Sequence, residues 1–263
     1  MSAGLAMAET TCPPAPGLAA LRDRAAPLTG ALRLETDPAD RDGWIGRDML
    51  ADPETGPFAE LHARFVAGGL ACNKRAAAAS LLLRYGWAAG FQIASWLDSG
   101  HVVRLDRFAI KFSASTLVEG VWIERACIDI ATAEQAGLAA LLASLKDFTE
   151  PLVESQHQWS RFSRHALWSM AVSSWAAQFA AIGQRLGRRD EAMEMARAMF
   201  ALDPEIARAA PETYVVGKGD RARGCQVRAA CCLYYKGPAR HFCASCPIIP
   251  QEERLARNRE WCS

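Results

Sequence analysis

The residues of this sequence whose types and spacing are best suited to chemistry are cysteines near its C-terminal end. Six of the nine cysteines come after residue 224. Cys231 and Cys232 are adjacent, and after ten intervening residues Cys243 and Cys246 form a Cys-x-x-Cys pair. Four thiolates that converge on one point bind either zinc or an iron-sulfur cluster. The spacing therefore predicts a four-cysteine metal site in the tail of the chain.

The adjacent pair of cysteines partly distinguishes between a zinc site and an iron-sulfur cluster. Neighbouring side chains diverge along most backbones, so Cys231 and Cys232 are poorly placed to hold one tetrahedral ion. A binuclear cluster is wider and accepts divergent sulfurs. Zinc ribbons usually present two Cys-x-x-Cys arms, whereas this tail has one, and Pro247 gives it the Cys-Pro ending common in iron-sulfur sequences. The residues favour an iron-sulfur cluster. The alternative is a structural zinc site in a zinc-stapled helical binding or interaction protein.

The pattern Cys-Cys-x10-Cys-x2-Cys, whose first residues read CCLYY, resembles the C-terminal motif of the FhuF-type ferric siderophore reductases. The specific resemblance covers the tail, and upstream the segment LLLRYGWAAGFQIASWL and the mid-chain helices are similar in layout only. In that family the motif holds a 2Fe-2S cluster. The resemblance leaves Cys225 and Cys262 unassigned. The cluster ligands that it implies are Cys231, Cys232, Cys243 and Cys246.

The resemblance also implies an activity and partners. It implies an oxidoreductase that transfers one electron to Fe(III) in a siderophore, of the hydroxamate type, and releases Fe(II) during iron acquisition. Siderophores bind Fe(III) through hard, anionic oxygen atoms, which hold the reduced ion more weakly. The sequence has no GxGxxG or Walker-type phosphate loop. We therefore expect a separate protein, such as a ferredoxin or a flavin reductase, to donate the electrons.

Two groups of residues are candidates for binding the substrate. Basic residues crowd the tail between residues 218 and 246, and this excess either favours a negatively charged cluster and acidic partners or forms a solvated loop. A helix expected after Pro151 places His157 and four later residues on one face, where arginines and a tryptophan suit a chelate. The same pattern fits an ordinary polar face with the tryptophan in the core. The candidate substrate-binding residues are Arg161, Arg164, His165, Trp168, Lys236 and Arg240.

The pattern of apolar residues predicts a mainly α protein of α+β type, a helical domain with a small central β-hairpin or sheet and a cysteine-rich tail. Residues 1–55 are rich in proline and predict a wrapping or mobile segment with short helices only. Residues 56–215 predict the helical domain, with two or three short strands near 101–130. One helix is expected over 75–97 and another from Pro151 to Leu186. Residues 216–263 form the cluster-binding region.

Composition narrows the class of protein further. The chain has 30 Lys and Arg against 29 Asp and Glu, and this balance argues against binding nucleic acid through bulk charge. The N-terminal sequence lacks the basic start and apolar middle of a secretory signal, so we expect a cytoplasmic protein with reduced thiols. Residues 166–184 carry no charge, and the serines and glutamines among them predict a buried core helix instead of a membrane span.

Overall fold

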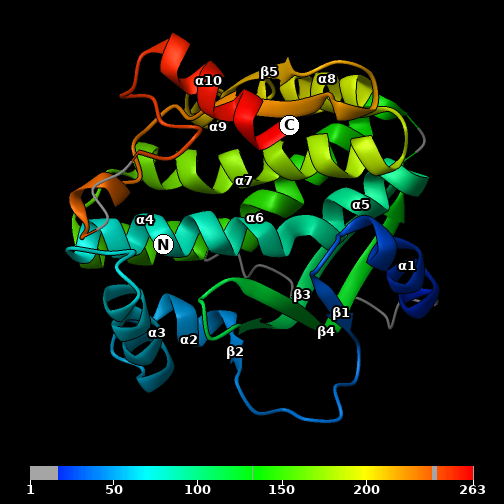
Figure 1. Cartoon of the computed structure of the whole chain (residues 1–263). Helices are drawn as coiled ribbons and strands as arrows, with labels where there is room; N and C mark the ends of the chain where they lie inside the picture. The colour runs from blue at the N-terminus through cyan, green and yellow to red at the C-terminus, as the bar shows by residue number, and fades with distance from the viewer. Residues whose placement is uncertain (1–16, 132, 239–241, 263) are drawn as a thin grey trace, which may run out of the picture.

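The computed structural model describes residues 17–131, 133–238 and 242–262. Its architecture is mainly α with a small sheet, as the sequence predicts. Figure 1 shows the elements in chain order. They are α1 (Leu18–Ala25), η1 (Ala26–Leu28), β1 (Arg33–Glu35), β2 (Trp44–Gly46), α2 (Arg47–Ala51), α3 (Gly56–Ala67), α4 (Lys74–Tyr85), η2 (Gly86–Ala89), α5 (Gly90–Ser99), β3 (His101–Phe112), β4 (Val118–Ile130), α6 (Glu134–Ser160), α7 (Arg164–Arg185), α8 (Arg189–Phe200), α9 (Pro204–Ala209), β5 (Glu212–Val216), η3 (Gly219–Arg221), β6 (Arg223–Val227), η4 (Tyr234–Lys236) and α10 (Gln251–Cys262).

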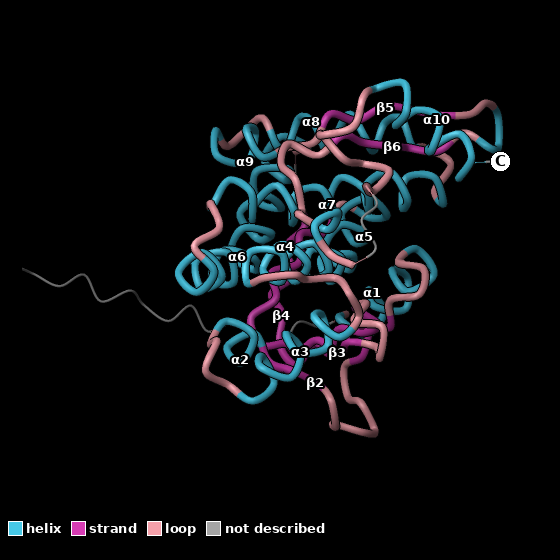
Figure 2. The backbone as a smooth tube through the Cα atoms, turned by 60° about the vertical axis from the view of Figure 1, so that its left-hand side comes forward, coloured by secondary structure: helices cyan, strands magenta, loops and turns pink. Residues whose placement is uncertain are grey.

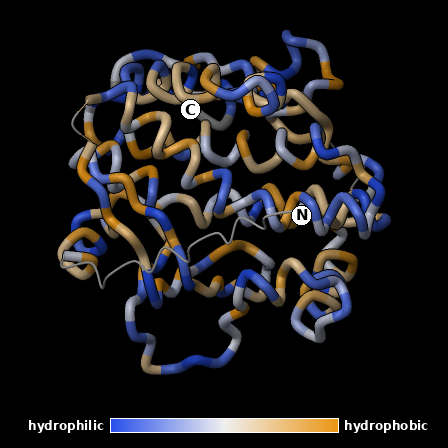
Figure 3. Tube along the Cα trace, turned by 180° about the vertical axis from the view of Figure 1, so that it is seen from behind, coloured by the Kyte–Doolittle hydropathy of each residue, from blue (hydrophilic) through white to orange (hydrophobic). Residues whose placement is uncertain are grey.

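The elements lie in three layers. Figures 1 and 2 show the central helices α4, α5, α6 and α7 between the four-stranded sheet and a layer that contains α8, the β5–β6 hairpin and α10. Helices α5 and α6 contact β3, whereas α7 contacts α8, α9 and β6. In Figure 3 the hydrophobic residues concentrate in the inner elements and the loop between β1 and β2 is hydrophilic. The β5–β6 hairpin and α10 therefore lie on the side of the helices that faces away from the sheet, whereas Gly237 and Pro238 of the tail lie beside Gly69, between α3 and α4.

The sheet is larger than the sequence predicts. Its strand order is β1-β4-β3-β2, and the antiparallel β3–β4 hairpin runs from the pair His101 and Ile130 to the pair Phe112 and Val118. The expected strands near 101–130 are present as two long strands. Strands β1 and β2 lie in the segment where we expected short helices only. Each has three residues, which is too short to show a period of two.

The helix expected from Pro151 to Leu186 is divided, and its start is wrong. Helix α6 runs through Pro151 because the carbonyl of Asp147, which the proline cannot bond, accepts a hydrogen bond of 3.3 Å from Arg47 Nη1. It ends at Ser160, since Arg161 adopts a left-handed backbone conformation with φ 57°. Ser163 then caps α7 by accepting a 3.2 Å bond from the backbone of Ala166.

The helix expected over 75–97 is also divided. The 3₁₀ turn η2 separates α4 from α5. At Gly86 a Cβ atom would lie 2.9 Å from the carbonyl oxygen of Ala171, so the absence of a side chain lets this turn approach α7. Tight helix packing at a glycine, which a sequence period does not reveal, explains the break.

The charge-free segment forms the buried core of α7, as expected. Trp168, Trp175 and Phe179 have no exposed surface. Within the described ranges, no helix combines the length and apolarity that crossing a membrane requires.

Asp203 joins the helical layers, so we expect its replacement to lower stability. It caps α9 by accepting bonds of 2.8 and 3.1 Å from the backbone of Glu205 and Ile206, and it pairs with Lys146 of α6 at 2.6 Å. The Lys146 hydrogen bond lowers the pKa of Asp203 below its ordinary value. Asp203→Ala should reduce the free energy of unfolding by about 1–2 kcal/mol at neutral pH.

The same contact predicts a pH dependence. Because the folded state lowers this pKa, its stabilisation is present above the unfolded value of about 4 and is lost as pH falls through the folded pKa. Urea unfolding of the wild type and Asp203→Ala between pH 2 and 7 measures this, since the difference should shrink in acid. A difference that stays constant with pH would contradict the ionic part of the role.

Candidate metal centre

The cysteine-rich segment follows β6 and is held mainly by backbone hydrogen bonds. Cys246 N donates to Cys243 O at 3.0 Å, which closes the Cys-x-x-Cys turn. Arg228 N donates to Ser245 O at 3.1 Å and joins the start of the segment to that turn. Ala230 N donates to Ser169 Oγ at 2.9 Å, so α7 anchors the residue just before the adjacent cysteines. These bonds position a segment that has little regular secondary structure.

The structure brings the four cysteines of the motif together. The thiol of Cys232 is in hydrogen-bonding contact with the thiols of both Cys231 and Cys243. Cys246 lies close enough to Cys231 and Cys243 to interact with them electrostatically. In the described part of the chain, no three His, Cys, Asp or Glu side chains are grouped in a way that could hold a metal ion. The thiols are thus a run of neighbours, with Cys232 between two others.

Burial of the four thiols is uneven. Cys246 is 2% exposed and Cys232 is 7% exposed, whereas Cys231 and Cys243 are half-buried. The cysteine group therefore has one side in the protein and one side near solvent.

Arg228 brings a buried positive charge to the cysteine group. Its side chain is 4% exposed, its Nη2 donates a hydrogen bond to Cys243 Sγ, and its Nη1 lies 3.8 Å from Met170 Sδ. A buried cation is costly unless an anion compensates it. Both side-chain contacts are to sulfur, so the anionic form of the cysteine group is the natural partner of this charge.

The pKa values of the thiols show where that negative charge lies. Hydrogen bonds from the thiols of Cys231 and Cys243 lower the pKa of Cys232, and the charge of Arg228 lowers it further. The same hydrogen bonds, together with burial, raise the pKa values of Cys231 and Cys243. These opposite shifts favour negative charge at Cys232 over negative charge at Cys231 or Cys243.

Backbone donors support the other two sulfurs. Leu233 N lies 3.3 Å from Cys231 Sγ, and Ile248 N lies 3.4 Å from Cys246 Sγ. Leu233 has φ 62°, an uncommon conformation for a leucine that costs of order 1–3 kcal/mol and persists only where its surroundings impose it. Backbone N–H groups directed at sulfur are among the features that tune metal-thiolate sites.

Sequence reasoning missed three residues of this site. Arg84 on α4 interacts electrostatically with Cys232, and although burial lowers the pKa of Arg84, this interaction partly offsets the effect. Arg254 on α10 donates to the carbonyls of Cys246 and Ile249 at 3.1 and 3.0 Å. Asn258 on α10 donates to Ala244 O at 3.2 Å. Arg84 is far from the cysteine motif in the sequence, so no pattern links the two. Arg254 and Asn258 could have been found, because they lie on a helix directly after the motif.

The candidate substrate residues between 161 and 168 lie at the end of α6 and on α7, in different surroundings. Arg161 and His165 are exposed. Arg164 is half-buried and pairs with three carboxylates, those of Glu150, Glu154 and Glu205. Trp168 is fully buried and packs edge-on against Trp175 at 6.1 Å between ring centroids. Because α6 ends at Ser160, Arg161 does not share a helix face with Arg164, His165 and Trp168, which all lie on α7.

Of the two candidate substrate residues in the tail, the structure describes only Lys236. Lys236 is exposed on η4, with its Nζ 5.9 Å from the ring centroid of Tyr235. Arg240 lies outside the described residues. Of the unassigned cysteines, Cys225 is buried on β6.

Comparison of the chain with protein-family models, with curated proteins and with solved structures finds no match.

The central position of Cys232 predicts that it dominates metal binding by the tail. Cys232→Ser should remove most of the bound metal, because the serine hydroxyl is a much poorer ligand for a soft metal site than a thiolate. Cys72→Ser is the matched control, since Cys72 is an exposed thiol outside the motif. Metal analysis of both variants after anaerobic purification tests this. Equal metal content in the two variants would refute the assignment.

Proposed function

We propose that Cys231, Cys232, Cys243 and Cys246 hold a 2Fe-2S cluster and that the protein reduces ferric siderophore complexes, releasing Fe(II). The observation that carries the proposal is the contact of Cys232 with Cys231 and Cys243, with Cys246 close by and a buried arginine beside them. The resemblance of the motif to FhuF-type reductases supports the substrate class. This makes the protein a ferric siderophore reductase.

The residues at the site fit such a cluster. The donor set is four thiols, the ligands that iron-sulfur clusters use. Arg228 and the backbone of Leu233 and Ile248 direct N–H groups at three of the sulfurs. When bound, a 2Fe-2S cluster supplies one electron at a time, which is the number that Fe(III) needs to become Fe(II).

The protein contributes charge, position and access. Arg228 stabilises the state of the site with the greater negative charge, because its guanidinium is buried in contact with Cys243. Helix α10 holds the Cys-x-x-Cys turn through Arg254 and Asn258, so the sulfurs keep their places when the charge changes. The half-buried positions of Cys231 and Cys243 leave one side of the site open to a substrate.

Electrons must reach the site from another molecule. We propose a separate protein donor, such as a ferredoxin or a flavin reductase. Lys218, Arg221 and Lys236 are exposed on the tail and favour an acidic partner surface.

Anaerobic purification tests the cofactor and the activity together. We expect a red-brown protein with about two iron and two sulfide ions per chain, whose visible bands bleach with dithionite. Mixing the reduced protein with a ferric siderophore should restore the bands while a ferrous chelator becomes coloured. A colourless protein with zinc in the tail would identify a zinc-stapled interaction protein instead. No reaction with several siderophore classes would reject the reductase activity.

Arg228 should set the reduction potential of the cluster. Arg228→Gln removes a buried positive charge beside the sulfurs, so we expect the midpoint potential to fall on the order of tens of millivolts. Arg221→Gln removes an exposed arginine of the same tail and is the control. Redox titration monitored by the visible spectrum measures both. An equal potential in the two variants would show that Arg228 does not tune the site.

A further inference from the structure

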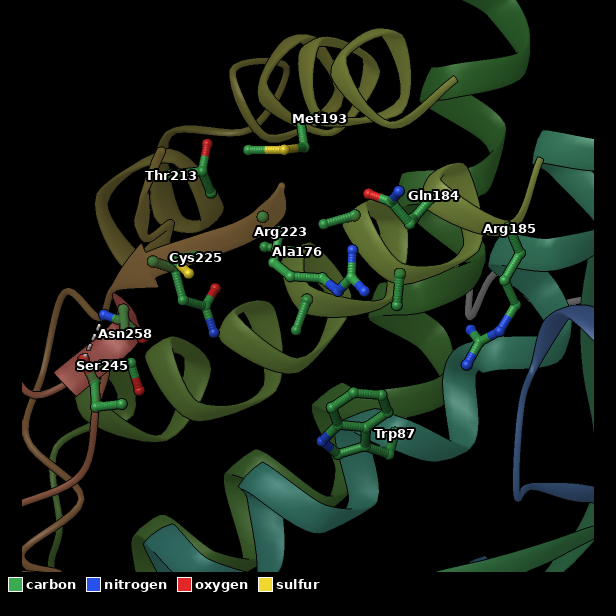
Figure 4. Close-up of a pocket in the computed structure, with 16 residues that line it drawn as sticks. Trp87, Ala176, Gln184, Arg185, Met193, Thr213, Arg223, Cys225, Ser245 and Asn258 are labelled. Carbon is green, nitrogen blue, oxygen red and sulfur yellow. Dashed lines mark hydrogen bonds between the residues drawn. The ribbon is translucent and has the colours of Figure 1, made fainter. Parts of the chain in front are cut away.

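A pocket of about 590 Å³ lies next to the cysteine group. It is bounded by α7, η2, α8, the β5–β6 hairpin and α10, as Figure 4 shows. Its wall includes Ala244 and Ser245, the two residues between Cys243 and Cys246. Since consecutive Cα atoms are about 3.8 Å apart, a ligand that touches Ser245 is on the order of 10 Å from the sulfur of Cys246. The volume is in the range of small-molecule sites, about 300–1,000 Å³.

The shape of the pocket suits a bulky ligand with a flat face. Four alanines of α7 line one wall, and their small side chains leave the space open. Trp87 contributes a flat ring that is 43% exposed, which is unusual for so large an apolar side chain. Met193 of α8 adds a flexible, polarizable side chain to the lining.

The charge of the pocket is positive. Arg223 and Arg185 line it, and none of the described residues that line it carries a carboxylate. In Figure 4 the Arg223 side chain extends toward the middle of the pocket, with Trp87 on another wall. Arg185 stands at the end nearer the N-terminal segment, where its Nη1 donates to Leu28 O at 3.0 Å. Gln184, Ser245 and Asn258 supply uncharged polar groups.

We propose that this pocket binds the ferric chelate and selects chelates with net negative charge, such as tris-catecholate or hydroxycarboxylate complexes, over neutral trihydroxamates. This inference rests on the proposed function and names its substrate class and site. Arg223 binds the anionic oxygens of the chelate by charge-assisted hydrogen bonds, and Trp87 packs against its flat, apolar part. This proposal differs from the hydroxamate type and the Arg161 face that the sequence suggested, because the pocket combines positive charge with the Cys-x-x-Cys turn.

Binding of gallium(III) chelates to the purified full-length protein tests the proposal, since gallium(III) complexes are not reduced. Wild-type protein should bind a gallium tris-catecholate at least about tenfold more tightly than a neutral gallium trihydroxamate. Arg223→Gln should weaken binding of the catecholate complex about tenfold, and Arg223→Lys should lose less because it keeps the charge. Ala177→Phe fills part of the pocket and should weaken binding of both complexes. Arg208→Gln, at an exposed arginine outside the pocket lining, should change neither affinity.

Several results would overturn the proposal. They are equal affinity of the wild type for the two complexes, no binding of the anionic complex, and unchanged binding of it in both Arg223→Gln and Ala177→Phe. The visible and circular dichroism spectra of each variant show whether it is folded, and Arg223→Gln replaces an exposed side chain, so it decides the matter if Ala177→Phe does not fold. Failure of the reductase activity is a separate observation: no ferric chelate would then reoxidise the reduced protein, whatever the gallium complexes show.

Discussion

The burial of most of α7 is the constraint on which the rest of this structure depends. A helix with a long charge-free segment must be covered, and α4, α5, α8, α9 and β6 all contact it. Its few polar groups then need partners in those elements. Ser174 Oγ donates to Leu83 O, and Gln178 Nε2 donates to Gly86 O at 3.0 Å. These bonds determine how α4 and the turn after it lie against the core.

The same constraint positions the cysteine-rich segment. Ser169 and Ser173 are one turn apart on α7, and they accept hydrogen bonds from Ala230 N and Gln226 Nε2. These two contacts bracket Arg228, whose guanidinium lies between Met170 on α7 and Cys243. A segment with little secondary structure of its own is thus held by two hydrogen bonds to α7, one to the Ser169 hydroxyl and one to the Ser173 carbonyl. Arg228 is buried because α7 is there to cover it.

Charge links the centre to the pocket beside it. The guanidinium of Arg228 needs an anion in the interior, and the cysteine group supplies one. Arg223 lines the pocket together with Ala244 and Ser245 of the Cys-x-x-Cys turn. A buried arginine in contact with sulfur and an exposed arginine in the pocket wall therefore both lie near this turn. In the proposed reaction the first tunes the donor of the electron and the second holds its acceptor.

The sequence by itself located the cysteine motif and determined the class of fold. The spacing of Cys231, Cys232, Cys243 and Cys246 identified the group that the structure brings together, and helical periodicity predicted a mainly α architecture with strands near 101–130. These are local patterns, so they can be predicted from the sequence. The three-residue strands and the helix break at Ser160 could not be predicted, because side-chain hydrogen bonds and packing against distant segments decide them.

Only the tertiary structure placed the residues that surround the cysteines. Arg84 interacts electrostatically with Cys232 because α4 packs on α7. Trp87 and Arg223 line one pocket because η2 and β6 both contact α7. The face proposed from Arg161 to Trp168 depended on one continuous helix, which a left-handed residue ends. Ligand spacing is a property of a short segment, whereas a binding pocket is made by elements far apart in the sequence. That physical difference explains why the sequence located the thiols and the structure located their neighbours.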